Sequence, residues 1–516
     1  MLRTVRPLMR SCLFLLLLAA LASAQNSEQR AARYLDSIRK EPPLLLALLR
    51  DMPKGGDLHN HLDGAIYAED LINFAADGGV CVDRTSSRLI APPCDDSCAN
   101  YTAKPLARCA YSDQVLYNQM VDAWSLRNWN PGNESGHDHF FATFDKFGLA
   151  SHTHVAEAIA ASTNRAGEDH LQYVEYMHTA DGGAAAALAA KVEWNSDFPK
   201  MRDALIAAGV KDVAVEASKR LEADQARARE IMKCGTADAM PGCTVDIRYL
   251  YQVLRGLPPQ IVFTQILLGF ELASSDPKFV GLNLVMAEDW YVPIRDFSEH
   301  MAMIDYLHSV YPKVHITLHA GELAIGLVPP EDLTFHIRSS VERGHAERIG
   351  HGVDVMNETN PIQLLHEMAD RNVLVEICLT SNDMILGVTG DDHPLPIYMK
   401  YGVPVALATD DEGVNRSDIT HEYLRAVETY HLSYADLKRM ARQSLEHAFL
   451  PGESLWKDTK LVFRINPACA GDVAGTAKPN AACEQFLSSS ERAREQWKLE
   501  TQFTEFEKKY DNPAFR

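Results

Sequence analysis

Two histidines stand two positions apart in the segment GGDLHNHLDGAIY, residues 55–67, and an aspartate follows them. Residues i and i+2 of a β-strand project from one face, so His59 and His61 would lie side by side. Two imidazoles arranged in this way could bind one divalent metal ion, although an isolated HxH pair is equally compatible with a polar loop. The pair predicts a metal site only if other parts of the chain supply further ligands.

Histidines and acids recur where three later apolar runs end. His319 and Glu322 end the run VHITLHAGE, His351 lies in RIGHGVD, and Asp410 with Asp411 ends VPVALATDD. Three histidines and one carboxylate are a common ligand set for zinc that leaves one position for water. A metal lowers the pKa of bound water to roughly 7 and so supplies hydroxide at neutral pH. These residues therefore predict hydrolytic chemistry, with Glu322 near the metal without binding it.

Eight short runs rich in Val, Ile, Leu and Tyr alternate with helical patterns and predict the strands that must position these residues. The runs cover residues 55–62, 171–178, 244–253, 280–288, 314–322, 348–354, 373–382 and 403–411. This alternation predicts an α/β fold, a parallel (β/α)₈ TIM-type barrel whose active site gathers at the C-terminal strand ends. An open doubly wound sheet is the alternative, but no glycine-rich phosphate loop follows any early run.

The sequence outside the eight runs predicts appendages to a barrel that occupies residues 53–450. Residues 25–52 predict an N-terminal helical segment that a prolyl pair interrupts. Residues 78–135 predict a disulfide-bearing insertion after the first strand, because four cysteines occur there without strong periodicity. Helices are expected at residues 184–232, and a C-terminal helical extension at residues 451–516.

Residues 1–24 have the pattern of a secretory signal peptide. Three arginines precede an apolar run of about ten residues and the small-residue triplet Ala22-Ser23-Ala24. The run is too short to span a bilayer, so cleavage near Ala24 is expected and an uncleaved anchor is the alternative. We therefore expect a secreted or periplasmic protein.

The net charge of the chain limits which kinds of molecule it is expected to bind. Fifty basic and 70 acidic residues give a formal net charge of −20. Such a chain repels phosphate backbones, which disfavours nucleic acids and anionic membranes as partners. A neutral or cationic small molecule fits better.

The cysteines predict disulfide bonds, as expected outside the cytoplasm. Cys378 is the exception, because it lies in the apolar run VLVEICL and is expected to be a buried free thiol. A zinc knuckle is a weaker alternative for the insertion, whose cysteine spacings lack a CxxC pair. The expected pairs are Cys234 with Cys243 and Cys469 with Cys483, and two more among Cys81, Cys94, Cys98 and Cys109 in one of three connectivities.

The four ordered motifs HNHLDGA, HAGE, GHG and TDD resemble the adenosine deaminase family of metal-dependent hydrolases. The signal segment, the N-terminal helices, the cysteine-bearing insertion and the pair Ser381-Asn382 most resemble the extracellular, growth-factor-related adenosine deaminases. The resemblance covers roughly residues 50–450. It implies a zinc enzyme that converts adenosine, and also 2′-deoxyadenosine, to inosine-type products and ammonia.

The resemblance also implies a role for each motif residue. Glu322 would protonate the purine ring nitrogen, and His351 would orient or deprotonate the attacking water. Asp411 would bind the purine, although it could instead replace Asp410 as a ligand. Asp63 would contact the ribose or shape a turn, and Glu175 would contact the ribose or carry a charge at the barrel mouth. The implied ligands of one Zn²⁺ per chain are His59, His61, His319 and Asp410.

Two departures from the family leave the substrate open. Glu412-Gly413 stands where many members of the family continue the double aspartate with proline. Many members also have a glycine, whose backbone faces the purine, near the position where this chain has the bulky Met286. The alternatives are a deaminase of another purine or a modified adenosine, and a growth-factor-like receptor-binding protein with a vestigial barrel.

The predicted helical segment at residues 25–52 carries an apolar stripe, which is relevant to whether the chain forms a dimer. The stripe must be buried on the same chain or against a second chain. The resembling extracellular deaminases pair through N-terminal helices, which favours a homodimer.

Overall fold

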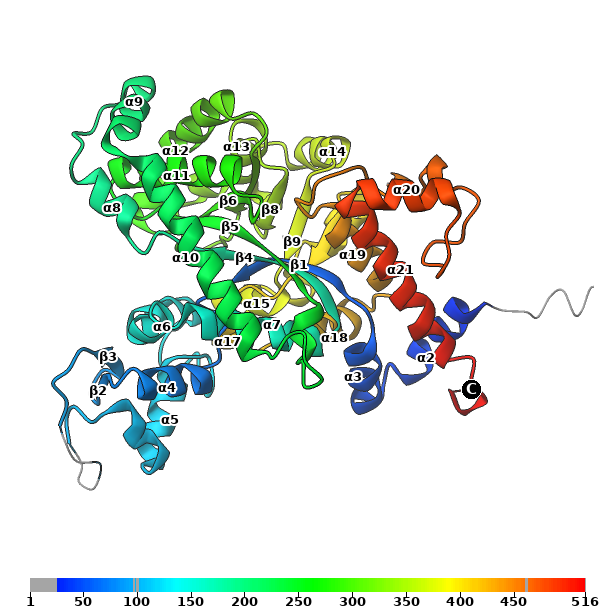
Figure 1. Ribbon diagram of the computed structural model, residues 1–516, viewed down its shortest axis with the longest axis horizontal. Helices are drawn as coiled ribbons and strands as arrows, with labels where there is room; N and C mark the ends of the chain where they lie inside the picture. Colours follow the sequence, from blue (N-terminus) through cyan, green and yellow to red (C-terminus); the bar gives the residue numbers. More distant parts are fainter. Residues whose placement is uncertain (1–25, 96–97, 99–101, 460–462, 516) are drawn as a thin grey trace, which may run out of the picture.

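A barrel of eight parallel strands forms the centre of the computed structural model, which describes residues 26–95, 98, 102–459 and 463–515 (Figure 1). A parallel bridge between Asn60 and Asp410 joins the last strand to the first, and the Asp410 amide donates to the His59 carbonyl over 2.9 Å. The predicted (β/α)₈ barrel is therefore confirmed. In order of pairing, the strands are β1 (Gly55–His61), β4 (Leu171–His178), β5 (Asp246–Leu254), β6 (Phe279–Val285), β7 (His315–Ala320), β8 (Arg348–His351), β9 (Leu374–Ile377) and β10 (Val405–Leu407).

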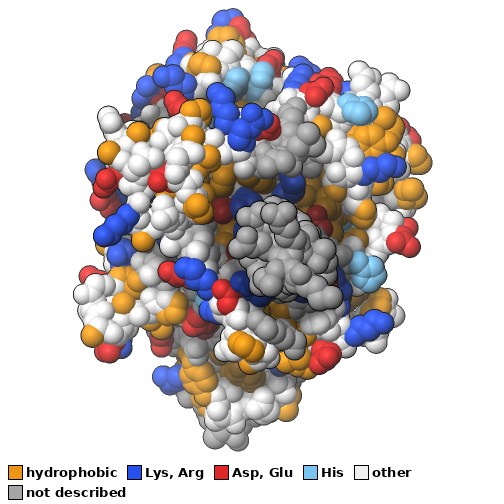
Figure 2. Space-filling view, turned by 90° about the vertical axis from the view of Figure 1, so that its right-hand side faces the viewer, with side chains coloured by type: hydrophobic (Ala, Val, Ile, Leu, Met, Phe, Trp, Pro, Cys, Tyr) orange, Lys and Arg blue, Asp and Glu red, His pale blue; other side chains and the backbone are white. Residues whose placement is uncertain are grey.

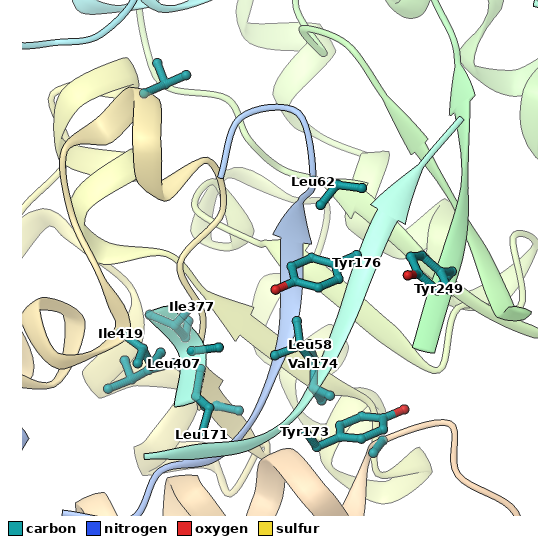
Figure 3. Close-up of a cluster of buried hydrophobic side chains, with 14 of the residues drawn as sticks. Leu58, Leu62, Leu171, Tyr173, Val174, Tyr176, Tyr249, Ile377, Leu407 and Ile419 are labelled. Carbon is teal, nitrogen blue, oxygen red and sulfur yellow. The ribbon is translucent and has the colours of Figure 1, made fainter. Parts of the chain in front are cut away.

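Most residues of the barrel strands are buried, as expected for parallel strands between the barrel interior and the surrounding helices. Every residue of β4 and of β6 is buried. Leu58 of β1, Val174 of β4 and Tyr249 of β5 belong to the main hydrophobic cluster, part of which Figure 3 shows. This core fixes where each strand ends, and therefore where the loop residues begin.

Helices follow the strands around the barrel. Three of them, α8 (Ala184–Ala189), α9 (Phe198–Ala208) and α10 (Val210–Ile231), occupy the region predicted to be helical at residues 184–232. The helices after the insertion are α6 (Gly136–Ser151), α7 (Val155–Glu168), α8 (Ala184–Ala189), α9 (Phe198–Ala208), α10 (Val210–Ile231), α11 (Pro259–Ser275), α12 (Tyr291–Val310), α13 (His336–Glu342), α14 (Pro361–Arg371), α15 (Leu379–Leu386), α16 (Leu395–Tyr401), α17 (Glu412–Asn415), α18 (Ile419–Tyr430) and α19 (Tyr434–Glu446).

The insertion after β1 is a small disulfide-linked unit. It contains α4 (Ala68–Asp77), the antiparallel pair β2 (Cys81–Asp83) and β3 (Arg88–Ile90), and α5 (Gln114–Ala123). Among the three possible connectivities, the structure has Cys81–Cys94 and Cys98–Cys109. The predicted pairs Cys234–Cys243 and Cys469–Cys483 are also present, and Cys378 is a buried free thiol.

The N-terminal helices α2 (Ser27–Ile38) and α3 (Pro42–Asp51) pack against the C-terminal part of the same chain. The α2 helix contacts α21 (Glu491–Lys509), as Figure 1 also shows, and α3 contacts α18. Leu35, Leu45 and Leu49 are fully buried by this packing. Most of the apolar stripe is thus covered within one chain, whereas Leu44 is exposed, and the homodimer stays a prediction.

The C-terminal extension adds a second, smaller hydrophobic cluster. It combines the short strands β11 (Trp456–Asp458) and β12 (Arg464–Ile465), the helix α20 (Ala481–Ser489) and the disulfide Cys469–Cys483. Trp497 of α21 packs in the same cluster. On the face of the molecule that Figure 2 shows, acidic and basic side chains lie interspersed with hydrophobic ones.

The predicted signal peptide lies outside the described residues. Of the helices in the described ranges, none has the length and apolar character that a membrane crossing requires.

Candidate active site

Four of the predicted site residues meet where β1, β7 and β10 end. His61 Nε2 lies 3.2 Å from His319 Nε2 and 3.3 Å from Asp410 Oδ1. Asp410 Oδ1 is also 3.5 Å from His59 Nε2. The candidate ligand atoms of all four side chains lie within 4.8 Å of one another. The structure thus brings together the set His59, His61, His319 and Asp410 that the sequence singled out.

Each histidine of this set is oriented by an acceptor at its other ring nitrogen. His59 Nδ1 lies 2.7 Å from Glu376, His61 Nδ1 lies 3.0 Å from Gln252, and His319 Nδ1 lies 2.9 Å from Asn283. An acceptor at Nδ1 favours the tautomer with a free lone pair on Nε2, which is the form that binds a metal. His59 Nε2 is buried and has no hydrogen-bond partner among the residues that the structure describes. The candidate ligand atoms of these four side chains therefore fit a divalent cation.

The residues that orient the histidines were not predicted from the sequence. Glu175, which was predicted as a possible substrate contact, belongs to the same hydrogen-bonded network. Glu376 accepts from Arg348 Nε over 2.6 Å, and Arg348 also binds the Glu175 carboxylate over 2.6 Å. Glu175 is fully buried and further accepts from Tyr173 and the Phe449 amide. Its carboxylate is held inside the barrel and does not line the pocket, so the prediction of a ribose contact was wrong.

Glu322 and His351 face each other beside the four-residue cluster. His351 Nε2 lies 3.6 Å from Glu322 Oε1, and His351 Nδ1 lies 2.9 Å from Asn382 Oδ1. The neighbouring Ser381 hydroxyl donates to Asp410 Oδ2. Burial raises the pKa of Glu322, an effect that the nearby Asp410 and Glu288 reinforce and His351 opposes. The site therefore holds a buried carboxyl group with a raised pKa next to an imidazole.

A cavity of about 280 Å³ opens above these groups. Asp63 and Asp411 line it, and Asp63 lies 3.8 Å from His152. Burial is the main reason that the pKa of Asp411 is raised well above its usual value. Gly64 leaves the space that Asp411 occupies, because a Cβ atom on Gly64 would lie 1.6 Å from Asp411 Oδ1. The cavity is thus lined both by ionisable groups and by residues of α6.

A family model described as adenosine deaminase matches residues 206–461. That range includes His319, Glu322, His351 and Asp410, whereas His59 and His61 precede it. The chain belongs to the adenosine deaminase family. The two candidate ligands on β1 therefore lie in a part of the barrel that the family match does not cover.

Individual proteins match this chain over shorter or more divergent stretches. An adenosine deaminase from Escherichia coli is 39% identical over 140 residues, which is 27% of this chain and 39% of that protein. The N6-methyl-AMP deaminase from Arabidopsis thaliana has a TM-score of 0.51 at 18% identity over 79% of this chain and 94% of that one. An amidohydrolase from Burkholderia ambifaria with bound Zn has a TM-score of 0.53 at 14% identity over 79% and 88% of the two chains. At these identities the two structures show a shared fold.

The departure from the adenosine deaminase family at Met286 lies on the pocket wall. Met286 has a φ of +84°, a left-handed conformation that favours glycine. His351 and Asp410 share this conformation, with φ of +67° and +59°. Such strained residues persist where the surrounding structure holds them, often at functional sites. Their occurrence at three strand ends could not be predicted from the sequence.

An aromatic wall on α6 is a second feature that sequence reasoning missed. Phe140, Phe141 and Phe144 line the cavity, and the Phe141 ring lies 5.6 Å from Trp290 at the start of α12. The spacing of the three phenylalanines on one helix could have indicated an apolar face, but not that the face would lie over the barrel mouth. This wall gives a flat organic ring an apolar surface to pack against.

Proposed function

We propose that this protein is a zinc-dependent hydrolytic deaminase that converts adenosine and 2′-deoxyadenosine to the corresponding inosine and ammonia. One observation carries the proposal: a metal-binding cluster, a buried carboxyl group and an imidazole share one cavity with an aromatic wall. Membership of the adenosine deaminase family supports the same reaction class.

The four-residue cluster would hold the metal. When bound there, a divalent ion would act as a Lewis acid and make hydroxide available near neutral pH. Three imidazoles and one carboxylate favour zinc over magnesium or calcium, which prefer oxygen ligands. The bound Zn in the amidohydrolase of similar fold supports this choice.

The remaining residues of the cavity move protons and orient the substrate. Glu322 donates its proton to the ring nitrogen beside the amino-bearing carbon, which makes that carbon electrophilic. His351, held at Nδ1 by Asn382, accepts a proton from the attacking water through Nε2. Asp411 hydrogen-bonds the opposite edge of the purine, and Asp63 binds the ribose. The oxygen of the water stays on the carbon. The proton that His351 accepted passes to the amino group, which leaves as ammonia, and the remaining hydroxyl proton returns to Glu322 as the carbonyl forms.

The cavity lining favours a nucleoside over a nucleotide. Among the described residues, no lysine or arginine lines the cavity, whereas Asp63, Asp145 and Asp411 do. Phosphate groups are bound in proteins mainly by Arg, Lys and backbone amides, and carboxylates repel them. A 5′-phosphate would therefore be disfavoured here, in contrast to the N6-methyl-AMP that names the Arabidopsis protein.

Ammonia release across a substrate panel tests this function. The zinc-loaded protein should act on adenosine and 2′-deoxyadenosine with a kcat/KM at least about 100-fold above that for AMP, because the 5′-phosphate would lie among carboxylates. Free adenine and N6-methyl-AMP complete the panel. Preference for AMP or adenine, or no ammonia from adenosine, would contradict the proposal.

We also propose that the protein is exported, to the periplasm or outside the cell. Four disulfides in the described part of the chain support this location, since such bonds persist in oxidising compartments. Peptide mapping of the protein from its native source should find a mature N-terminus near Gln25. An intact Met1 in the soluble fraction of the cytoplasm would contradict export.

A further inference from the structure

We propose that Glu288 is a positioning residue that holds the loop bearing Glu322 in the place required for proton donation. Glu288 follows β6, and Glu322 follows the neighbouring strand β7. The inference rests on the proposed function, because it concerns the residue that we take to be the proton donor. Neither the ligand cluster nor the substrate cavity includes Glu288.

Two backbone amides of the Glu322 loop donate to this one carboxylate. Gly321 N lies 3.2 Å from Glu288 Oε1, and Glu322 N lies 2.9 Å from Glu288 Oε2. His336 Nδ1 lies 2.6 Å from Oε1 and supplies a third hydrogen bond. Glu288 is 1% exposed, so water does not compete for these bonds. The carboxylate thus fixes the backbone at the residue that carries the reactive side chain.

The loop depends on these bonds because regular structure ends before it. The strand β7 ends at Ala320, and residues 321–324 belong to no helix or strand. On the opposite side, the Gly321 carbonyl accepts from the Val353 amide over 2.8 Å. Gly321 has a φ of +74°, and a Cβ atom there would lie 2.4 Å from Asp354 Oδ1. The backbone at Gly321 is therefore held from two sides in a conformation suited to glycine.

The surroundings of Glu288 keep its carboxylate ionised. Burial alone would raise its pKa, but the hydrogen bond and charge of His336 and the charge of Arg255 outweigh burial and lower the pKa to about 2. An ionised carboxylate has only acceptors, so both oxygens are available to backbone amides. Arg255 itself donates to the carbonyls of Met286 and His319, which ties the β6 loop to the end of β7.

The variant Glu288→Gln tests the proposal, because a carboxamide has the same shape but places an NH₂ group against one of the donors. We expect kcat on adenosine to fall about 10- to 100-fold, because a displacement of the catalytic group by about 1 Å lowers the rate by up to about that factor. The KM should stay within about twofold of the wild-type value. Zinc content should stay unchanged. Glu358→Gln is the matched control, because Glu358 is also buried and accepts from two backbone amides, those of Ile337 and Arg338, neither of which belongs to the Glu322 loop. The control should keep its kcat within about twofold.

A double-mutant cycle separates positioning from general damage. If Glu288 acts through Glu322, Glu288→Gln should lower kcat little further in the Glu322→Gln background. Equal losses in both backgrounds, or a normal kcat in Glu288→Gln, would overturn the proposal. Should Glu288→Gln not fold, Glu288→Asp carries the same comparison, because it keeps the charge and shortens the side chain.

Hydrogen exchange tests the positioning without any activity. In the zinc-loaded protein, Glu288→Gln should speed amide exchange in peptides covering residues 319–326, whereas Glu358→Gln should not. Unchanged exchange in these peptides overturns the positioning role. A wild-type protein that releases no ammonia from adenosine refutes the proposed function instead, and the exchange result still decides whether Glu288 holds the loop.

Discussion

Glu322 and His351 lie 3.6 Å apart in a buried site, and this pair carries the proton transfers that we assign to the reaction. Of the residues around them, the sequence predicted those that stand at strand ends, because their types and spacing are visible in short motifs. It did not predict Glu376, Gln252 and Asn283, which lie within β9, β5 and β6 and act through hydrogen bonds to histidines. A polar residue in a buried strand is a weak signal for that role.

Glu175 shows why a strand-end argument can fail. It precedes the last residue of β4 by three positions, so its side chain lies deeper in the barrel than the loop residues. There it binds Arg348, which also pairs with Glu376. Whether Glu175 contacts the substrate or forms an internal ion pair depends on its distance from the end of the strand. The sequence predicts that distance only to within a few residues.

At the scale of one residue, Glu322→Gln should remove most activity while the fold and the bound zinc remain. The amide has nearly the same shape, but it cannot deliver a proton, and general acid catalysis is worth about 10²–10⁴-fold. Steady-state ammonia release, zinc content and the thermal unfolding temperature are measured together. Near-normal turnover in a zinc-loaded variant would exclude Glu322 as the proton donor.

Elements were predictable where periodic patterns are long and were missed where they are short. All eight barrel strands and the two N-terminal helices follow from apolar runs, and α3 begins at the prolyl pair because proline is tolerated in the first turn. The pair β2 and β3 was not predicted, since strands of three residues show no alternation. The position of α6 over the barrel mouth depends on long-range packing that a local pattern does not contain.

Helix α12 carries a pH-dependent contribution to stability. His300 is fully buried, and neither ring nitrogen has a hydrogen-bond partner in the described residues. Burial lowers its pKa from 6.5 to about 4, a fall that Asp296 opposes and Arg255 and Arg295 reinforce. Between these two values the unfolded chain binds the proton more tightly than the folded chain. Stability from the neutral imidazole is therefore complete above pH 6.5 and is lost as the pH falls towards 4.

The variant His300→Leu should remove this pH dependence. On lowering the pH from 7 to 5, wild-type protein should lose about 2 kcal/mol more unfolding free energy than the variant. Urea unfolding followed by tryptophan fluorescence at both pH values measures the difference. An equal acid-induced loss in both proteins would show that His300 does not titrate in this way.

At the scale of the whole molecule, the two ends of the chain pack together beside the barrel. Arg30 pairs with Asp511 over 2.6 Å, and Lys438 pairs with Glu28 over 2.9 Å. The sequence predicted the apolar stripe on α2 and α3 but could not determine which surface covers it, because the covering helices lie more than about 360 residues further along the chain.

Leu35→Ala tests the energetic weight of this packing. Leu35 is fully buried, so the substitution should lower the free energy of unfolding by about 2–5 kcal/mol. Leu44→Ala in the same segment is the control, because Leu44 is 44% exposed and should cost about 0.5 kcal/mol or less. Light scattering on both variants shows whether assembly changes. Equal costs for the two variants would mean that the α2 packing is not formed in solution.

The central claim is that one metal ion, held by His59, His61, His319 and Asp410, supports deamination of adenosine. The most direct test is the rate of ammonia release from adenosine as chelator-stripped protein is titrated with zinc. The rate should rise from near zero and reach its plateau at about one zinc per chain, and His319→Ala should not respond. Full activity in the metal-free protein, or a plateau at two zinc ions per chain, would contradict the account.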